Sequence, residues 1–255
     1  MADLIRMVGI TKYYGRVRAL EDVDFSVREQ EIVGLLGDNG AGKSTLIKVL
    51  SGAVPVTSGE IWVRGEKAEI RSTTDAIRYG IETIYQDSAL VTQLSIARNL
   101  FLGREPVKGP RWLGRMDLAA MNEVASGLLR KVGIEKRIPP ETPIAALSGG
   151  ERQAVAIARA MHFDSDLIVL DEPTNNLGVA ETQGVLNFVR GARASGHSCI
   201  FIAHNIHHVF QVVDRIVVMR RGRVVADDID PKASSVEAVE QVITGMTAEG
   251  VPVGE

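Results

Sequence analysis

The first thirty residues alternate between apolar and polar side chains, as strands do when one face is buried. Val23, Phe25 and Val27 fall on one face, and the polar residues between them fall on the other. This stretch therefore predicts an antiparallel sheet that is half buried. The apolar run at 31–37 then predicts a short strand, and the helix-forming residues after it end at Gly52.

The middle of the chain favours helices. A loop containing proline and glycine lies around residues 106–110, and Asp117 follows as the expected cap of a helix at 118–132. The apolar residues of that helix recur on one face, and Gly133 ends it. We therefore expect a mostly helical subdomain at about 87–160.

The last third returns to strands. Apolar runs at 166–173 and 198–204 predict buried parallel strands that end in polar residues. The segment 215–227 predicts two strands around a turn at Arg221-Gly222. Strands that alternate with helices indicate an α/β fold with a mainly parallel sheet, an N-terminal antiparallel β subdomain and an inserted helical subdomain.

Composition narrows the class of protein. A chain of 255 residues fits one large domain or two small ones, and a net charge of −3 argues against nucleic acid as the main partner. Cys199 is the only cysteine, which excludes an internal disulfide and suits a reducing compartment. The sequence shows neither a leader pattern nor an apolar run near the roughly 20 residues that cross a bilayer. We therefore expect a cytoplasmic protein, unless another protein holds it at a membrane.

The segment "GDNGAGKST" at 37–45 matches the P-loop pattern Gly-x4-Gly-Lys-Ser/Thr between a predicted strand and a predicted helix. Its glycines allow backbone N–H groups to surround phosphate oxygens at a helix N-terminus. Lys43 would reach the β- and γ-phosphates of a nucleotide, and the Ser44 hydroxyl would bind Mg²⁺. A chance glycine-rich turn is the alternative, at about one match per hundred chains of this length. The candidate nucleotide-binding residues here are Gly37, Asp38, Asn39, Gly40, Ala41, Gly42, Lys43, Ser44 and Thr45.

Polar residues at two later strand ends can complete such a site. Asp171 ends one apolar run, where its carboxylate could hold Mg²⁺, and Glu172 could act as the base for an attacking water. His204 ends the next run, where it could contact the γ-phosphate. The alternatives are a pair of solvated acids, a structural His204, or a metal site formed with the neighbouring histidines at 207 and 208.

The segment "LSGGE" at 147–151 opens a predicted helix. Ser148 and Glu151 have the spacing of a capping box, which requires no glycine. Gly149 and Gly150 nevertheless follow the serine, although each costs a helix about 1 kcal/mol relative to alanine.

The order of these motifs, with Gln86 between the first two, resembles the ATP-binding subunits of ABC transporters from about Leu4 to about Asp227. The resemblance implies a single ATPase domain over 1–255 with a P-loop NTPase core. Its expected parts are the nucleotide-binding core with the β subdomain (1–86 and 161–230), the helical subdomain (87–160) and a C-terminal tail (231–255).

In this family two subunits dimerise head to tail around ATP. The resemblance implies that Ser148, Gly149 and Gly150 bind the γ-phosphate held by the other copy, so that bare backbone at a helix N-terminus serves a purpose. It implies that Tyr14 stacks on adenine, with Tyr13 as the weaker candidate and strand packing as the alternative. Gln86 would sense Mg²⁺ and the attacking water.

One position departs from the family pattern. The loop after "DEPT" usually ends in Leu-Asp, and here it reads "NNLG", with Gly178 in place of the aspartate. We expect hydrolysis to persist, because Lys43, Asp171, Glu172 and His204 are intact, but we expect weaker coupling between the two ATP sites.

The P-loop segment, residues 85–105 and the "TNNLG" loop further resemble the ATPases of monosaccharide importers. The implied partners are a second copy, transmembrane permease subunits and, indirectly, a sugar-binding protein outside the membrane. This would place the chain on the inner face of the membrane. The alternatives are an ABC ATPase serving cofactor assembly and a non-hydrolysing sensor, the latter disfavoured by the Asp171-Glu172 pair. The interval before 147 is too short for the coiled coils of DNA-structural members.

Overall fold

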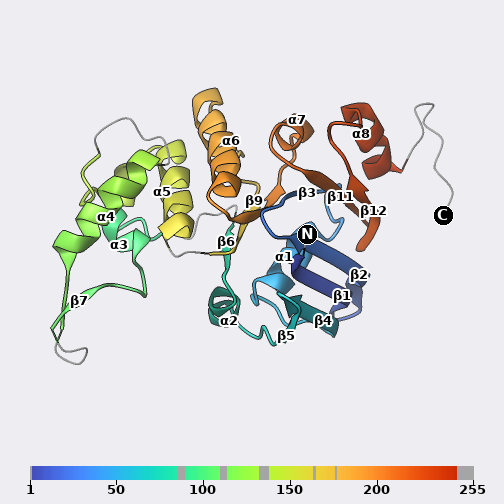
Figure 1. Cartoon of the computed structure of the whole chain (residues 1–255), viewed down its shortest axis with the longest axis horizontal. Helices are drawn as coiled ribbons and strands as arrows, with labels where there is room; N and C mark the ends of the chain where they lie inside the picture. Colours follow the sequence, from blue (N-terminus) through green and yellow to red (C-terminus); the bar gives the residue numbers. More distant parts are fainter. Residues whose placement is uncertain are drawn as a thin grey trace. The chain divides into compact units, whose positions relative to one another are not determined.

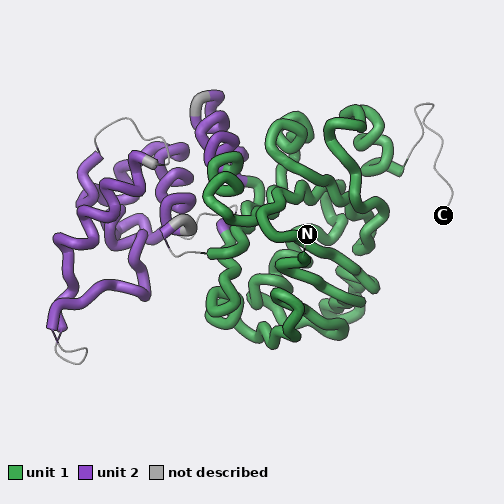
Figure 2. Tube along the Cα trace, viewed as in Figure 1, with its two compact units in different colours: residues 1–83, 165–172, 189–255 green, residues 84–164, 173–188 purple. Residues whose placement is uncertain are grey.

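The structure, a computed structural model, describes residues 2–85, 90–109, 114–131, 138–162, 165–175 and 177–245. These residues form two compact units (Figure 2). Unit 1 contains residues 1–83, 165–172 and 189–255, and unit 2 contains residues 84–164 and 173–188.

The alternating N-terminal segment folds into the predicted antiparallel sheet. Strand β1 (Asp3–Tyr14) pairs with β2 (Val17–Arg28) and with β4 (Ser58–Val63), and β5 (Glu66–Ala68) completes the order β2-β1-β4-β5. Val23, Phe25 and Val27 are buried as the pattern predicts.

The second sheet of unit 1 carries the parallel strands and has the order β12-β11-β3-β10-β9-β6. Strands β11, β3, β10 and β9 pair in parallel, while β12 returns antiparallel beside β11 around the predicted turn. The bounds are β3 (Ile32–Leu36), β6 (Ile81–Ile84), β9 (Leu167–Asp171), β10 (Ser198–Ile202), β11 (Arg215–Arg220) and β12 (Arg223–Ile229).

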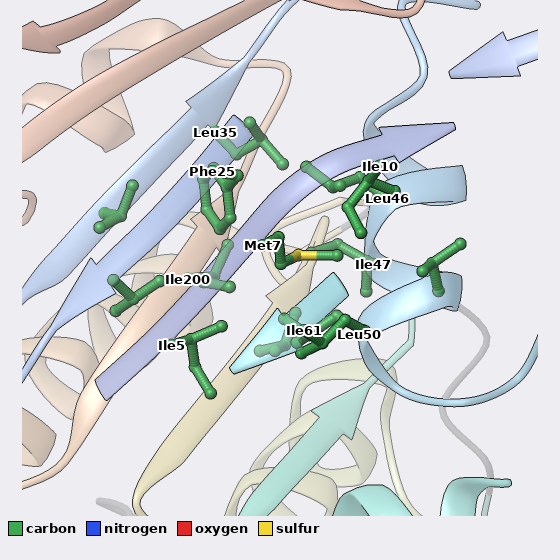
Figure 3. Packing of buried hydrophobic residues seen from close by; sticks show 14 of the residues in the cluster. Ile5, Met7, Ile10, Phe25, Leu35, Leu46, Ile47, Leu50, Ile61 and Ile200 are labelled. Carbon is green, nitrogen blue, oxygen red and sulfur yellow. The ribbon is translucent and has the colours of Figure 1, made fainter. Parts of the chain in front are cut away.

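Helix α1 (Lys43–Leu50) joins the two sheets of unit 1 through a common core. Its side chains Leu46, Ile47 and Leu50 meet Met7 of β1 and Ile61 of β4 in one buried cluster (Figure 3). The other helices in this part of the chain are α2 (Thr73–Arg78), α7 (Ile206–Phe210) and α8 (Val236–Thr244), which begin after the capping side chains of Ser72, Asn205 and Ser235 (Figure 1).

Unit 2 is mainly helical and has its own apolar core. Met121, Ala125 and Leu128 line the buried face of α4, as their spacing predicts. Leu118, predicted on the same face, is 53% exposed because it begins the helix, and Val132 and Gly133 lie outside the described residues. The Asp117 carboxylate accepts a hydrogen bond from the Ala120 N–H at 3.1 Å. The elements are α3 (Ile96–Leu100), β7 (Val107–Lys108), β8 (Arg115–Met116), α4 (Leu118–Lys131), the short 3₁₀ helix Ile144–Ala146 and α5 (Gly149–His162). Helix α6 (Val179–Ala194) begins in unit 2 and ends in unit 1.

Among the described residues, no helix combines the length and the apolar character that crossing a membrane requires.

Candidate active site

The P-loop pattern folds into a tight turn between β3 and α1, and its glycines are required by that turn. Gly37, Gly40 and Gly42 have φ angles of 150°, 78° and 105°, in the region that favours glycine. A Cβ on Gly37 would lie 2.2 Å from the carbonyl oxygen of Met219, so no other residue fits there without movement. The remaining predicted nucleotide-binding residues of this segment lie on the same loop or in the first turn of α1: Asp38, Asn39, Ala41, Lys43, Ser44 and Thr45.

Lys43 is buried, and its ammonium is held inside this loop. Its Nζ donates hydrogen bonds to the carbonyl oxygens of Gly37 at 2.7 Å and Asp38 at 3.1 Å. Burial lowers the pKa of Lys43, while the negative charges of Glu172 and Asp171 act in the opposite direction. The ammonium therefore lies close enough to both predicted acids for their charges to act on it.

Asp171 is the last residue of β9, where its carboxylate lies mostly buried at 8% exposure. Burial and the neighbouring Glu172 charge raise the pKa of Asp171, and the Lys43 charge partly offsets them. A buried carboxylate beside a phosphate-binding loop, with the Ser44 hydroxyl in the first turn of α1, offers the hard oxygen ligands that Mg²⁺ prefers. The described residues contain no group of three or more His, Cys, Asp or Glu side chains that could hold a metal alone, so phosphate oxygens and water would complete such a site.

Glu172 and His204, which were predicted separately, lie in direct contact. The Nε2 of His204 is 2.6 Å from Oε1 of Glu172. The contact follows from topology, because β9 and β10 are neighbouring parallel strands whose ends pair Asp171 with Ile202, and the Glu172 N–H donates to the Ile202 carbonyl at 2.9 Å. Glu172 is 12% exposed and His204 47% exposed, so the carboxylate is enclosed while the imidazole faces outward.

The backbone also constrains this pair. Glu172 has a φ of 54°, a left-handed conformation that is strained for a residue with a side chain. After His204, Asn205 caps α7 by accepting a hydrogen bond from the His207 N–H at 3.0 Å, which fixes where the chain turns. Such strain at a site residue indicates that the surrounding structure imposes the position of its carboxylate.

The predicted adenine-stacking residues lie at the end of β1. Tyr14 is 45% exposed and Tyr13 is 43% exposed. The Nζ of Lys12 lies 5.2 Å from the centroid of the Tyr14 ring, in the range of a cation–π contact. Gln86 lies outside the described residues.

The glycines at the start of α5 are explained by different contacts. The predicted capping box is confirmed: the Ser148 N–H donates to Oε2 of Glu151 at 2.8 Å, and the Glu151 N–H donates to Oγ of Ser148 at 3.2 Å. A Cβ on Gly149 would meet no atom of the described residues within 4 Å, so this end of the helix is open. A Cβ on Gly150 would lie 2.0 Å from Cγ of Glu181, a residue that sequence reasoning missed.

The P-loop, Asp171, Glu172 and His204 thus lie at the carboxyl ends of the parallel strands β3, β9 and β10, whereas Tyr14 lies at the end of the antiparallel β1, and Ser148, Gly149 and Gly150 lie at the start of a helix of unit 2. The family model described as ABC transporter matches residues 20–175, which is more than half of the chain. This chain belongs to the ABC transporter family. The family membership that the motifs indicated is therefore confirmed. The predicted α/β fold class is confirmed as well.

Named relatives of this ABC protein are ATP-binding proteins for import. The fructose import ATP-binding protein FrcA of Rhizobium meliloti is 43% identical over 241 residues, which cover 93% of this chain and 92% of that protein. The xylose/arabinose import ATP-binding protein XylG of Sulfolobus acidocaldarius is 40% identical over 256 residues, covering 100% of this chain and 99% of that protein.

The ABC chain spans less than half the length of some other relatives. The ribose import ATP-binding protein RbsA 3 of Rubrobacter xylanophilus is 39% identical over 226 residues, which cover 89% of this chain but 44% of that protein. A solved nucleotide-free ATP-binding cassette from an ABC transporter matches with a TM-score of 0.80 at 24% identity, covering 99% of this chain and 100% of that one. The chain therefore has the fold of an ATP-binding cassette.

Proposed function

We propose that this chain is the ATP-binding and ATP-hydrolysing subunit that powers an ABC importer, with a monosaccharide as cargo. The observation that carries the enzymatic part is the 2.6 Å contact between Glu172 and His204 beside the buried Lys43 and Asp171. The names of the relatives, which specify import of fructose, xylose or arabinose and ribose, support the choice of cargo.

Residues of one subunit bind the nucleotide in this proposal. Tyr14 stacks on adenine, the backbone N–H groups of the P-loop (37–45) bind the phosphates, and Lys43 moves from the loop carbonyls to the β- and γ-phosphates. Ser44, Asp171 and Gln86 would hold Mg²⁺, which neutralises phosphate charge when bound.

Glu172 then orients the attacking water and accepts its proton at the carboxylate. The contact with Nε2 of His204 holds the carboxylate in place and keeps the imidazole at the position from which it can donate to the γ-phosphate. The left-handed backbone conformation of Glu172 fixes the direction in which this side chain leaves the backbone. The positions of Glu172 and His204 thus depend on the ends of two neighbouring strands, β9 and β10.

Two copies complete the two sites. Ser148, Gly149 and Gly150 of each copy bind the γ-phosphate held by the P-loop of the other copy, because a helix N-terminus presents N–H groups and partial positive charge. The nucleotide-binding core (1–86 and 161–230) and the helical subdomain (87–160) would then close together around ATP. Permease subunits would hold this dimer on the inner face of the membrane, and a sugar-binding protein would supply the cargo from outside.

Steady-state ATP hydrolysis by the purified chain tests the enzymatic proposal. Glu172→Gln keeps the shape of the side chain but removes the base, so kcat should fall roughly 10²- to 10⁴-fold while ATP binding persists. His204→Ala should slow hydrolysis in the parent chain and have little further effect in the Glu172→Gln background, because the two groups act as a unit. Full turnover by Glu172→Gln, or additive losses in the double variant, would contradict these assignments.

A second experiment tests the importer. The tagged chain is recovered from detergent-solubilised membranes of the source organism, and bound proteins are identified by mass spectrometry. Recovery of a multi-span permease is expected, followed by ATP-dependent uptake of labelled pentoses or hexoses by the reconstituted complex. Recovery of scaffold proteins without membrane spans, and of no permease, would contradict the proposed role in import. It would not affect the conclusions drawn from ATP hydrolysis.

A further inference from the structure

The side chain of Glu181 lies against two glycines that are far apart in sequence. A Cβ on Gly150 would lie 2.0 Å from Cγ of Glu181, and a Cβ on Gly178 would lie 2.5 Å from Oε2 of the same residue. Both distances are too short for real contacts, so the aliphatic part of Glu181 covers Gly150 and its carboxylate covers Gly178. All three residues belong to unit 2.

The three residues occupy positions of consequence for the proposed reaction. Gly150 is the second residue of α5, which starts within the "LSGGE" segment (147–151). Glu181 lies in the first turn of α6. Gly178 lies directly before α6, and residues 173–175 follow Glu172 in a turn. One side chain therefore bridges the segment that follows the candidate base and the helix start that would bind the γ-phosphate in the other site of a dimer.

The charges favour this arrangement only when position 178 is glycine. A carboxylate in the first turn of α6 and beside the first turn of α5 interacts favourably with the partial positive charge of both helix N-termini. An aspartate at 178 would place a second carboxylate within contact distance of Oε2 of Glu181 and would be repelled by it. The absence of a side chain at position 178 thus leaves the space that the Glu181 carboxylate occupies.

We propose that Glu181 is a positioning residue for ATP hydrolysis. Its carboxylate lies beside Gly178, where the family pattern has an aspartate, and its side chain couples α5 to the segment after Glu172. The inference rests on the proposed function. It revises the expectation from sequence that Gly178 removes a charge and weakens coupling, because the charge is present three residues later. When α5 moves on binding the partner's nucleotide, the Glu181 side chain transmits that movement to the segment at Gly178. The two glycines have no flexible side chains that could absorb the movement.

Thermal unfolding without nucleotide tests the contact itself. Gly178→Asp should lower Tm by roughly 3–8 °C, because it overpacks the site and opposes two like charges. In a Glu181→Ala background the same change should cost less than about 2 °C, because the opposing side chain is gone. An equal loss of Tm in both backgrounds would overturn the contact.

ATP hydrolysis tests the positioning role. Glu181→Gln keeps the shape and removes the charge, so Tm should stay within about 2 °C while kcat falls roughly tenfold and the Hill coefficient for ATP approaches 1. The double variant Gly178→Asp/Glu181→Ala returns a carboxylate to the loop and should recover kcat to within about threefold of the parent. Wild-type kcat and Hill coefficient in Glu181→Gln would overturn the role.

Glu237→Gln is the matched control, because Glu237 is an exposed acid in the first turn of α8 and its substitution should leave kcat and the Hill coefficient for ATP unchanged. The two proposals fail differently. If the parent chain shows no ATP turnover, the proposed function and the role of Glu181 in it are both wrong, whereas the Tm comparison at 178 and 181 still decides the contact. If the parent chain turns over ATP and Glu181→Gln matches it, only the role of Glu181 is wrong.

Discussion

Glu172 is held at its position by its backbone as well as by its side chain. With a φ of 54° it occupies a region where a Cβ is crowded, and the Nε2 of His204 lies 2.6 Å from its carboxylate. Residues kept in this conformation are maintained by the surrounding packing, here two neighbouring parallel strands. The backbone conformation of Glu172, on which the proposed chemistry depends, therefore lowers the free energy of unfolding.

This strain predicts that two variants with the same loss of activity differ in stability. Glu172→Gly and Glu172→Ala both remove the base, so both should abolish most ATP hydrolysis. Only glycine also relieves the left-handed backbone, so it should be more stable than the alanine variant by about 1 kcal/mol. Urea unfolding of the two variants measures the difference, and a glycine variant no more stable than alanine would show that the conformation carries no cost here.

Among the elements, the segment before α3 is built around one buried amide. Asn99 is 0% exposed, and its Oδ1 accepts a hydrogen bond from the Val91 N–H at 2.7 Å. Its Nδ2 donates to the carbonyl oxygens of Val91 at 3.0 Å, Leu94 at 3.2 Å and Ser95 at 3.0 Å. The side chain thus binds one N–H and three carbonyl groups of residues 91–95, and it adds to the backbone hydrogen bonds that those carbonyl oxygens already accept.

Asn99→Asp should therefore be severely destabilising. The substitution replaces a donor by an oxygen that faces three carbonyl oxygens, and we expect the free energy of unfolding to fall by about 3 kcal/mol or more. Asn187→Asp on the exposed face of α6 is the control, with an expected change below about 0.5 kcal/mol. Equal stability of the two variants in urea would mean that the Asn99 amide contributes little.

The cap of α4 gives the fold a pH dependence. The hydrogen bond from the Ala120 N–H and the nearby Lys108 ammonium hold the pKa of Asp117 below its ordinary value of 3.8. A lowered pKa in the folded state contributes stability above the unfolded value and loses it as the pH falls through the folded value. The Tm of Asp117→Ala should therefore lie below that of the parent by a constant amount above about pH 5, and the gap should close below pH 3.8.

Asp117→Asn separates the two components of this prediction. Asparagine caps a helix about as well as aspartate but does not titrate, so its Tm should lie between those of the parent and the alanine variant at neutral pH. A gap between parent and alanine variant that persists unchanged to about pH 3 would show that the Asp117 carboxylate is not the titrating group.

Over the whole molecule, the features that could be predicted from the sequence are those that depend on short-range patterns of residues. The alternation at Val23 to Val27 locates the antiparallel sheet, and the polar ends of two apolar runs locate Asp171, Glu172 and His204 near one another. The hairpin of β7 and β8 was not predicted, because two-residue strands with exposed side chains show no alternation.

Contacts between distant segments could not be predicted from the same patterns. The sequence shows that Gly178 lacks a side chain, but only the structure shows the Glu181 carboxylate beside it and the rest of that side chain on Gly150. Asn99 belongs to a residue type that is usually exposed, and its burial depends on three carbonyl groups brought together by a loop. Local propensity carries no information about such partners.

An exposed apolar side chain lies next to the position that the proposed dimer places between copies. Val179 is 90% exposed and is the first residue of α6, directly after Gly178, where the family resemblance implies the contact between copies. Burial of a valine contributes about 1.5 kcal/mol or more, and a symmetric interface contains each residue twice. In the Glu172→Gln chain, which should retain ATP, Val179→Ser should therefore raise the dimer Kd at least roughly tenfold.

Sedimentation equilibrium with ATP and Mg²⁺ measures this Kd. Val225→Ser, on the exposed strand β12, is the matched control and should leave it unchanged, because nothing in the proposal places β12 between copies. Both variants replace an exposed valine by serine, so a difference between them reports the position of the substitution rather than its chemistry. Equal dimer Kd values for Val179→Ser and its parent would exclude the start of α6 from the interface between copies.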